Sequence, residues 1–266
     1  MAEYFRERRV TERRSCLDER ATDTHFVGEP SEEDRIFKRA ASASRKDRSR
    51  MPKVRVSNFS VSLDGYGAGP RQNLTNPLGV GGESLHDWLV VTRTFKQMVG
   101  EKGGGEGVDD RFAAAGHTGI GATIMGRNMF GPVRGAWPDE EWKGWWGDNP
   151  PYHHDVFVLT RYPRPSFDME GGTSFHFVTD GIGNALDRAV VAAKGQDVLI
   201  AGGASTIQQY LAAGLIDELH LAIAPVLLGG GERLFDHLGD RPVGYEVAEL
   251  VKGEAAMHAR LLRQSP

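Results

Sequence analysis

Short runs of apolar residues, separated by polar and glycine-rich segments, extend along the chain from about residue 53. Val54, Val56, Phe59 and Val61 predict a first strand. Further apolar runs of strand length lie at residues 121–126, 155–160, 175–179, 197–202 and 218–228. The spacing of apolar positions predicts helices over residues 84–99, 184–193 and 205–213.

Strands that alternate with helices predict an α/β fold with a mainly parallel central sheet and helices on both faces. After Asp217 the helical pattern stops, and residues 245–251 and 256–262 predict an antiparallel C-terminal hairpin. The segments 65–82 and 101–110 are rich in glycine and other turn residues, so we expect loops there, the second a mobile surface loop.

The first fifty residues differ in composition from the rest. They hold one of the 34 glycines, and their 13 Lys/Arg and 11 Asp/Glu balance at +2, whereas the whole chain carries −4. Such a segment buries too little apolar surface to offset its ordering entropy. We therefore expect residues 1–50 to be a disordered charged extension and residues 51–266 to be one domain. A nucleic-acid-binding arm is less favoured, because the interleaved acids cancel the basic field.

Several other classes are disfavoured by the sequence. No run approaches the roughly 18 apolar residues of a membrane span and no apolar signal core opens the chain, so we expect a cytoplasmic protein without a membrane partner. The single cysteine, Cys16, cannot form an internal disulfide. His153 and His154 lack a third ligand at helical or hairpin spacing, so no metal site is expected.

The sequence LIAGGASTIQQYL at 199–211 leads from a strand into a helix through two glycines. Such a junction puts free backbone N–H groups and the positive end of a helix dipole at the carboxyl edge of the sheet, where phosphate binds. Ser205, with Gln208 three residues later, predicts a hydroxyl cap for this helix. A tight turn that needs small residues for packing alone is the alternative. Neither GxGxxG after a strand nor GxxxxGK[ST] occurs, which disfavours ordinary Rossmann and P-loop domains.

Four stretches, in this order, resemble one family. They are SVSLDGYGAGP at 60–70, TIMGRNMFG at 123–131, VFVLTR at 156–161 and DVLIAGGASTIQQYLAAGLIDELHLAIAPVLLGGGERLF at 197–235. On these motifs the chain resembles the dihydrofolate-reductase-like superfamily, in the branch related to the C-terminal reductase domain of the bifunctional riboflavin-biosynthesis deaminase/reductase. The resemblance covers about residues 53–263 and implies a three-layer α/β fold.

The resemblance also implies hydride transfer from NADPH to a small heterocycle of pteridine or pyrimidine type. Arg127 would bind the 2′-phosphate, a task that suits a planar guanidinium, although an arginine after a strand often forms a surface ion pair instead. The pyrophosphate would lie against residues 202–206, with the bond between the two glycines cis, and residues 160–161 would lie on the adenosine side. The implied cofactor-binding residues are Gly126, Arg127, Thr160, Arg161, Gly202, Gly203, Ala204, Ser205 and Thr206.

Hydride transfer needs a proton source as well. The candidate catalytic residues are Asp64, in SLDG, and Asp87, on the first predicted helix. Asp64 has a structural alternative as part of an Asp-Gly turn, and His86 is expected at the surface. The family carries an acid where this chain has Ala201, so the phosphoribosylamino-uracil substrate of the family is left open.

Other features leave alternatives. Segment 136–154 holds four of the five tryptophans and could be a lid over the substrate, a dimer contact or a locally packed loop. The deaminase half of the bifunctional enzyme is absent, because Cys16 alone cannot supply its zinc ligands. A dihydrofolate reductase proper and a non-catalytic nucleotide-binding protein on the same fold are the alternative functions. Relatives of this type imply a possible homodimer.

Overall fold

The computed structural model describes residues 52–131, 134–239 and 244–264. The predictions for residues 1–50, including Cys16, lie outside this range. None of the helices in the described ranges has both the length and the apolar character that crossing a bilayer requires.

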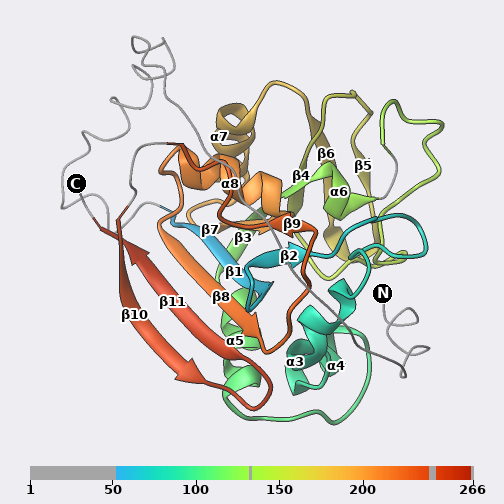
Figure 1. The fold of residues 1–266 in the computed structure, drawn as a ribbon. Coiled ribbons are helices and arrows are strands. Elements are labelled where there is room, and N and C mark those ends of the chain that lie inside the picture. Colours follow the sequence, from blue (N-terminus) through green and yellow to red (C-terminus); the bar gives the residue numbers. More distant parts are fainter. Residues whose placement is uncertain (1–51, 132–133, 240–243, 265–266) are drawn as a thin grey trace. The chain divides into compact units, whose positions relative to one another are not determined.

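A nine-stranded sheet forms the centre of the domain (Figure 1). In spatial order its strands are β10 (Tyr245–Lys252), β11 (Met257–Arg263), β8 (Glu218–Ala224), β1 (Val54–Ser62), β7 (Asp197–Gly202), β3 (Ile120–Gly126), β4 (Asp155–Leu159), β6 (Ser174–Val178) and β5 (Phe167–Asp168). The strands from β8 to β6 pair in parallel, while β11, β10 and β5 are antiparallel at the two edges. The predicted mainly parallel sheet with a C-terminal hairpin is confirmed.

A separate ribbon pairs β2 (Tyr66–Ala68) with β9 (Glu232–Arg233). The sequence predicts only loop at residues 65–82, so this short strand corrects the prediction. Its reason is tertiary, because a three-residue strand forms only where a distant segment offers backbone partners. The ribbon holds the start of the 65–82 segment against the region that follows β8, with the Leu234 amide bonded to the Gly65 carbonyl.

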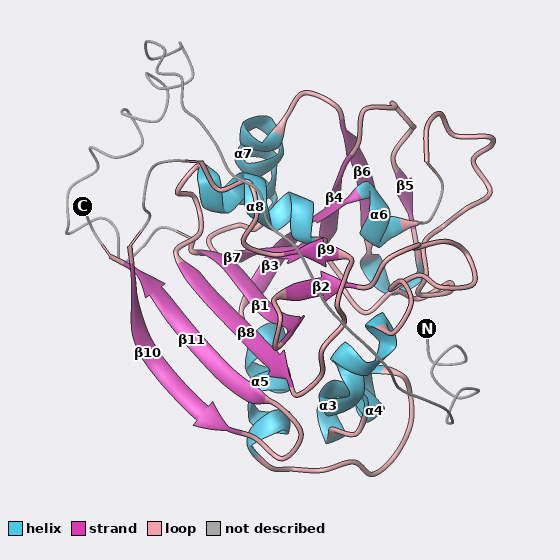
Figure 2. Ribbon diagram, viewed as in Figure 1, coloured by secondary structure: helices cyan, strands magenta, loops and turns pink. Residues whose placement is uncertain are grey.

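Helices cover both faces of the sheet (Figure 2). On one face α7 (Ile182–Ala192) and α8 (Ala204–Ala212) bury aliphatic residues such as Ile124 and Ile200. The other face carries α3 (Asp87–Val90), α4 (Arg93–Met98) and α5 (Val108–His117), where Trp88 packs with Ala113 and Ala222. Because neighbouring strand residues point to opposite faces, each strand contributes to both cores, and the result is the predicted three-layer arrangement.

Strand β1 contains one extra residue, Asn58, which adopts a φ of 56°. Its parallel pairing with β8 shifts register between Val56 and Phe59, as a β-bulge requires. The bulge explains the spacing of apolar residues along this strand. Val54, Val56, Phe59 and Val61 all reach the core under α7 and α8, although a regular strand would turn the last two to the other face.

The predicted helix over residues 84–99 is broken into three short segments: η1 (Gly82–His86), α3 and α4. The break comes at Thr92, whose side chain is buried. Its hydroxyl donates to the Leu89 carbonyl at 2.7 Å and accepts from the Phe95 amide at 3.1 Å, so Thr92 ends one turn and caps α4. The apolar spacing of the sequence did not reveal this cap, because threonine fits both a helix face and an N-cap.

Helix α5 was missed altogether, since residues 101–110 were predicted as loop and the helix begins at Val108. Its first amides, those of Val108 and Asp109, donate to the two oxygens of the Glu254 carboxylate at 3.0 and 2.9 Å. Glu254 lies on the turn between β10 and β11, far along the sequence. A cap supplied by a distant residue leaves no local signal at the helix start.

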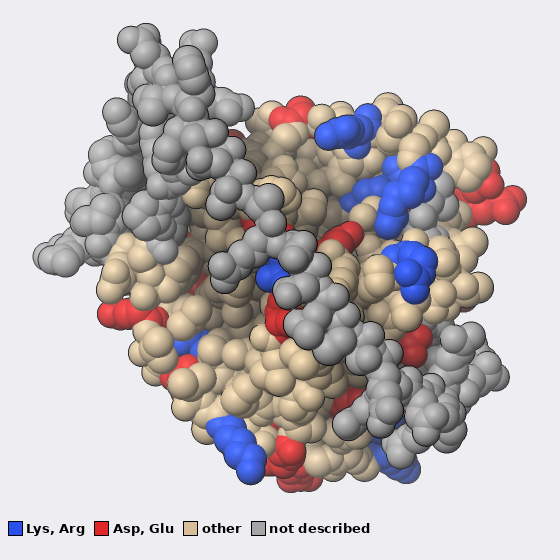
Figure 3. Space-filling model, viewed as in Figure 1, with Lys and Arg blue, Asp and Glu red and all other residues tan. Residues whose placement is uncertain are grey.

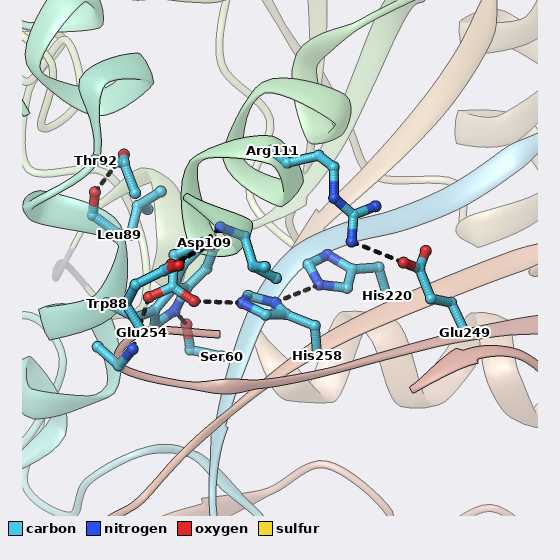
Figure 4. A network of polar contacts seen from close by, with 12 residues as sticks. Ser60, Trp88, Leu89, Thr92, Asp109, Arg111, His220, Glu249, Glu254 and His258 are labelled. Carbon is cyan, nitrogen blue, oxygen red and sulfur yellow. Dashed lines mark hydrogen bonds and ion pairs between the residues drawn. The ribbon is translucent and has the colours of Figure 1, made fainter. Parts of the chain in front are cut away.

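A buried polar chain ties α5 to the sheet (Figure 4). The Asn58 amide donates to Nδ1 of His220 at 3.0 Å, so that ring carries its proton on Nε2, 3.0 Å from Nδ1 of His258. His258 in turn donates from Nε2 to the Asp109 carboxylate at 2.8 Å. Burial beside His258 lowers the pKa of His220 to about 3, so the His220 ring is a neutral link in this network. This network of hydrogen bonds therefore holds the bulge residue Asn58 in place.

Candidate functional site

A polar cleft of about 540 Å³ opens at the carboxyl edge of the sheet. It is bounded by the ends of β3, β4, β6 and β7 and by the start of α8. Three arginines line it, Arg127, Arg134 and Arg161, with Glu232 as the single acid among its described lining residues. Lys and Arg side chains gather on the part of this face over α6 (Arg127–Phe130) and its neighbouring strands (Figure 3). The cleft is therefore suited to an anionic ligand.

The start of α8 faces this cleft without a side-chain cap. The N-cap is Gly203, and the bond between Gly202 and Gly203 is cis, as the resemblance implied. The predicted hydroxyl cap at Ser205 is wrong: Ser205 lies inside the helix, and the Gln208 side chain donates to the Arg233 carbonyl. Because no side chain occupies the helix start, its amides and the positive end of its dipole remain available to a ligand.

Arg127 opens helix α6 directly after β3, with its guanidinium over the ring of Trp137 at 3.1 Å. Its Nη1 donates to the Thr160 hydroxyl at 3.2 Å, whereas the buried Nε and Nη2 have no hydrogen-bond partner among the described residues. Burial, together with the positive charges of Arg134 and Arg164, lowers the pKa of Arg127 to about 10. Two N–H donors without an acceptor, surrounded by other positive charges, favour the binding of an oxyanion, which would accept both hydrogen bonds and offset the charge.

Most of the implied cofactor residues meet in this cleft. Gly203 lines the cleft. Ala204 lines a second cavity, described below, and Gly202 lines neither of the two cavities. Gly126 and Thr206 lie in direct contact, since a Cβ at Gly126 would clash with the Thr206 hydroxyl. The predicted residues that line the cleft are Gly126, Arg127, Thr160, Arg161, Gly203, Ser205 and Thr206. The shared cleft expected from the strand ends is thus present.

The two predicted catalytic carboxylates lie elsewhere. Asp64 accepts from the Ser62 hydroxyl at 2.6 Å and from the amides of Leu228 and Gly229 at 3.1 and 2.7 Å. Asp87 is exposed on the first turn of α3. Neither side chain lines either cavity, so the structure supports the turn interpretation of Asp64 and leaves both catalytic assignments as predictions without geometric support.

A second cavity of about 240 Å³, here called the chamber, lies on the α3–α5 side of the sheet. Its walls are mainly apolar and come from β1, β7, the short helices and the tryptophan-rich segment. His86 and His117 line it, and burial lowers the pKa of both, that of His86 to about 4. The expectation that His86 lies at the surface is wrong, because the break after η1 turns it into the chamber.

The tryptophan-rich segment packs locally and also forms a wall of the chamber. The indole N–H of Trp142 donates to the Phe130 carbonyl, and Trp146 stacks near Phe175. The buried Arg164 fixes the segment by donating to the carbonyls of Trp142 and Glu140. Its residues Trp145, Trp146 and Tyr152 line the chamber. The segment is thus packed locally, as the packed-loop interpretation expects, and three of its residues line the chamber.

The cleft and the chamber meet at three residues, Asn128, Gly203 and Glu232, which line both. Glu232 is the one ionisable side chain among these three residues. Its carboxylate lies 3.8 Å from the position that a Cβ would take if Gly203 carried a side chain. The sequence analysis did not single out Glu232, Asn128 or His117. The motif around Glu232 was recognised, but only the ribbon of β2 and β9 shows that this residue turns toward the glycine pair.

The family model of the RibD C-terminal domain matches residues 52–257. The chain belongs to this family. This match supports a riboflavin-pathway-reductase-like function. A curated relative, the uncharacterized protein YyaP of Bacillus subtilis, is 49% identical over 41 residues, which cover 15% of this chain and 22% of that protein.

Two solved proteins are similar to this chain over most of its length. A protein assigned to riboflavin biosynthesis in Shewanella sp. PV-4 matches with a TM-score of 0.51 and 24% identity, covering 80% of this chain and 99% of that one. A pyrimidine reductase-like protein of Corynebacterium diphtheriae matches with a TM-score of 0.47 and 14% identity, covering 86% and 99%.

Proposed function

We propose that this chain is an NADPH-dependent reductase of a small heterocycle of pteridine or pyrimidine type. The observation that carries the proposal is the Arg127 guanidinium, which lines the cleft together with the uncapped start of α8 and has two buried nitrogens without a partner among the described residues. A cofactor with a 2′-phosphate and a pyrophosphate supplies anions for both. The residues present therefore fit NADPH.

The division of the site supports the same reaction. In the cleft, Arg127, Thr160, Arg161 and the start of α8 would hold the phosphates and the adenosine. Bound NADPH would supply a hydride to a C=N or C=O carbon of the substrate. The apolar walls of the chamber exclude water from the substrate side, and Glu232 at the junction can hold a proton or order a water molecule for the atom that gains charge.

Titration of the purified chain with NADPH and NADH, followed by tryptophan fluorescence, tests the cofactor. We expect NADPH to bind at least about tenfold more tightly, since a paired phosphate is worth about 1.4 kcal/mol or more. Arg127→Ala should remove most of that preference, and Arg127→Lys should restore part of it. Arg111→Ala, a control whose exposed guanidinium pairs with Glu249, should leave it unchanged. Failure to bind either nucleotide, or an unchanged preference in Arg127→Ala, would contradict the proposal.

Turnover separates the remaining alternatives. Oxidation of NADPH in the presence of a panel of pteridines and pyrimidines supports an enzyme, while binding without turnover of any of them favours the non-catalytic alternative. For a dihydrofolate reductase proper the first-helix carboxylate should face the substrate, but Asp87 does not line the chamber. The homodimer stays a prediction.

A further inference from the structure

The walls of the chamber are formed largely by carbon. Aromatic residues of the lining come from three parts of the chain: Phe59 from β1, Phe95 from α4, and Trp145 and Trp146 from the tryptophan-rich segment. Leu199 and other aliphatic residues complete the walls. A cavity of about 240 Å³ lies below the roughly 300–1,000 Å³ of most ligand sites, so it matches a small ligand built on one flat ring system.

The polar groups of the chamber carry almost no charge. Asn58, Ser60 and Gln72 can donate or accept hydrogen bonds to the edge of a ring. The imidazoles of His86 and His117 are neutral at pH 7, because burial lowers the pKa of each. Among the described residues that line the chamber, none is Lys or Arg, and the single acid is Glu232.

A phosphate group in this chamber would therefore find no cation. It would lose its hydration among aromatic walls and face the Glu232 carboxylate, and both effects oppose binding. The arginines of the site, Arg127, Arg134 and Arg161, line the separate cleft that we assign to the cofactor. The two cavities thus differ in charge: the cleft is cationic, whereas the chamber is nearly neutral.

We propose that the substrate of this chain is a flat, uncharged heterocycle without a phosphate group, bound in the chamber. This inference rests on the proposed reductase function and narrows its substrate class to a dephosphorylated pyrimidine or pteridine. The hydrogen-bonding groups Asn58, Ser60 and Gln72 then recognise the ring edge, and the two tryptophans cover it.

A matched pair of compounds tests the inference: 5-amino-6-(ribosylamino)uracil and its 5′-phosphate. Binding of each to the NADPH-loaded full chain is followed by tryptophan fluorescence, and oxidation of NADPH is followed by absorbance. We expect the dephosphorylated compound to bind at least tenfold more tightly and to show the higher kcat/KM where turnover occurs. Equal or tighter binding of the phosphate, or binding of neither compound, would overturn the inference. Binding of NADPH, measured first without substrate, reports on the proposed function separately.

A charge placed at the rim of the chamber tests the physical reason. Met98 lines the chamber and is 36% exposed, so its replacement should not disturb the core. In Met98→Lys we expect the phosphorylated compound to bind at least fivefold more tightly than in the unchanged chain, and the dephosphorylated one to change less than twofold. Met98→Gln, of similar length but neutral, should change the binding of both compounds by the same factor and so leave their ratio as it is in the wild-type protein. No gain for the phosphorylated compound in Met98→Lys would show that a missing cation is not what excludes phosphate.

Discussion

Asp64 illustrates how one residue can fit two roles in the sequence and one in the structure. A carboxylate in an Asp-Gly pair at the end of a strand suits both a turn and a substrate contact. Burial raises the pKa of Asp64, but hydrogen bonds from the Ser62 hydroxyl and the amides of Gly229 and Leu228 outweigh it and lower the pKa overall. The ionised carboxylate thus fastens the end of β1 to the loop after β8.

Asp64→Asn separates the structural role from catalysis. The amide group keeps one acceptor but points N–H groups at backbone N–H donors, so we expect a loss of about 1–2 kcal/mol in the free energy of unfolding. Urea denaturation measures this loss. We expect kcat to fall less than tenfold, whereas removing a proton donor costs about 10²–10⁴-fold. A loss of kcat in that larger range with unchanged stability would restore Asp64 as a catalytic candidate.

At the level of single residues, the sequence predicted the cleft better than the chamber. Gly126, Arg127, Thr160 and Arg161 follow the ends of parallel strands, and such ends share one edge of the sheet whatever the loops do. The chamber depends on long-range packing instead. His86 faces it because the first predicted helix is broken after η1, a tertiary detail that apolar spacing does not encode.

Secondary-structure elements were predicted well where the apolar pattern is long and local. The six parallel strands and helices α7 and α8 lie close to their expected ranges. Three of the missed elements, β2, β9 and α5, share one cause, because each is fixed by a partner distant in the sequence. Helix α5 depends on Glu254 at its start and on His258 through Asp109.

The buried chain that holds α5 gives a prediction at the scale of elements. In Asp109→Asn one carboxylate oxygen becomes an N–H group, which must then face either His258 Nε2–H or the Ala255 amide. We expect the free energy of unfolding to fall by about 2–3 kcal/mol, because a buried donor is left unsatisfied. Chemical denaturation measures the change, and Asp187→Asn, on the exposed face of α7, is a matched control expected to stay within about 0.5 kcal/mol. Equal stability of the two variants would contradict the stabilising role assigned to the buried hydrogen-bond network of Asp109 and His258.

For the molecule as a whole, the sequence predicts the kind of sheet but not its order. Alternating strands and helices require mostly parallel pairing, yet many orders of six strands satisfy that rule. The observed order places β1 between β8 and β7, so the first strand is central although it begins the domain. Local periodicity does not encode this order.

Acid sensitivity is a property of the whole molecule, because burial lowers the pKa of four histidines, His86, His117, His154 and His220, and lowers it strongly in three of them. The pKa of His86 and of His154 is lowered to about 4, and that of His220 to about 3. Unfolding returns each to about 6.5, so the unfolded chain binds more protons and stability falls as the pH drops from about 6.5 toward 4. We expect Tm to fall by about 5–10 °C between pH 7 and pH 5 in thermal unfolding followed by circular dichroism.

The same scan on His220→Asn should show a shallower decrease, because one of the titrating groups is gone. A Tm that stays constant across this pH range in the unchanged chain would show that these rings are not held neutral.

The bulge at Asn58 has an unusual consequence for tolerance to deletion. Removing one residue from a strand normally exchanges its inward and outward faces for the rest of its length. In β1 the extra residue Asn58 already shifts the alternation of faces by one position. A variant that lacks Asn58 would therefore have regularly alternating inward apolar residues and would pair with β8 without a register shift. Such a shortened strand would keep the core while withdrawing the backbone amide that His220 accepts from.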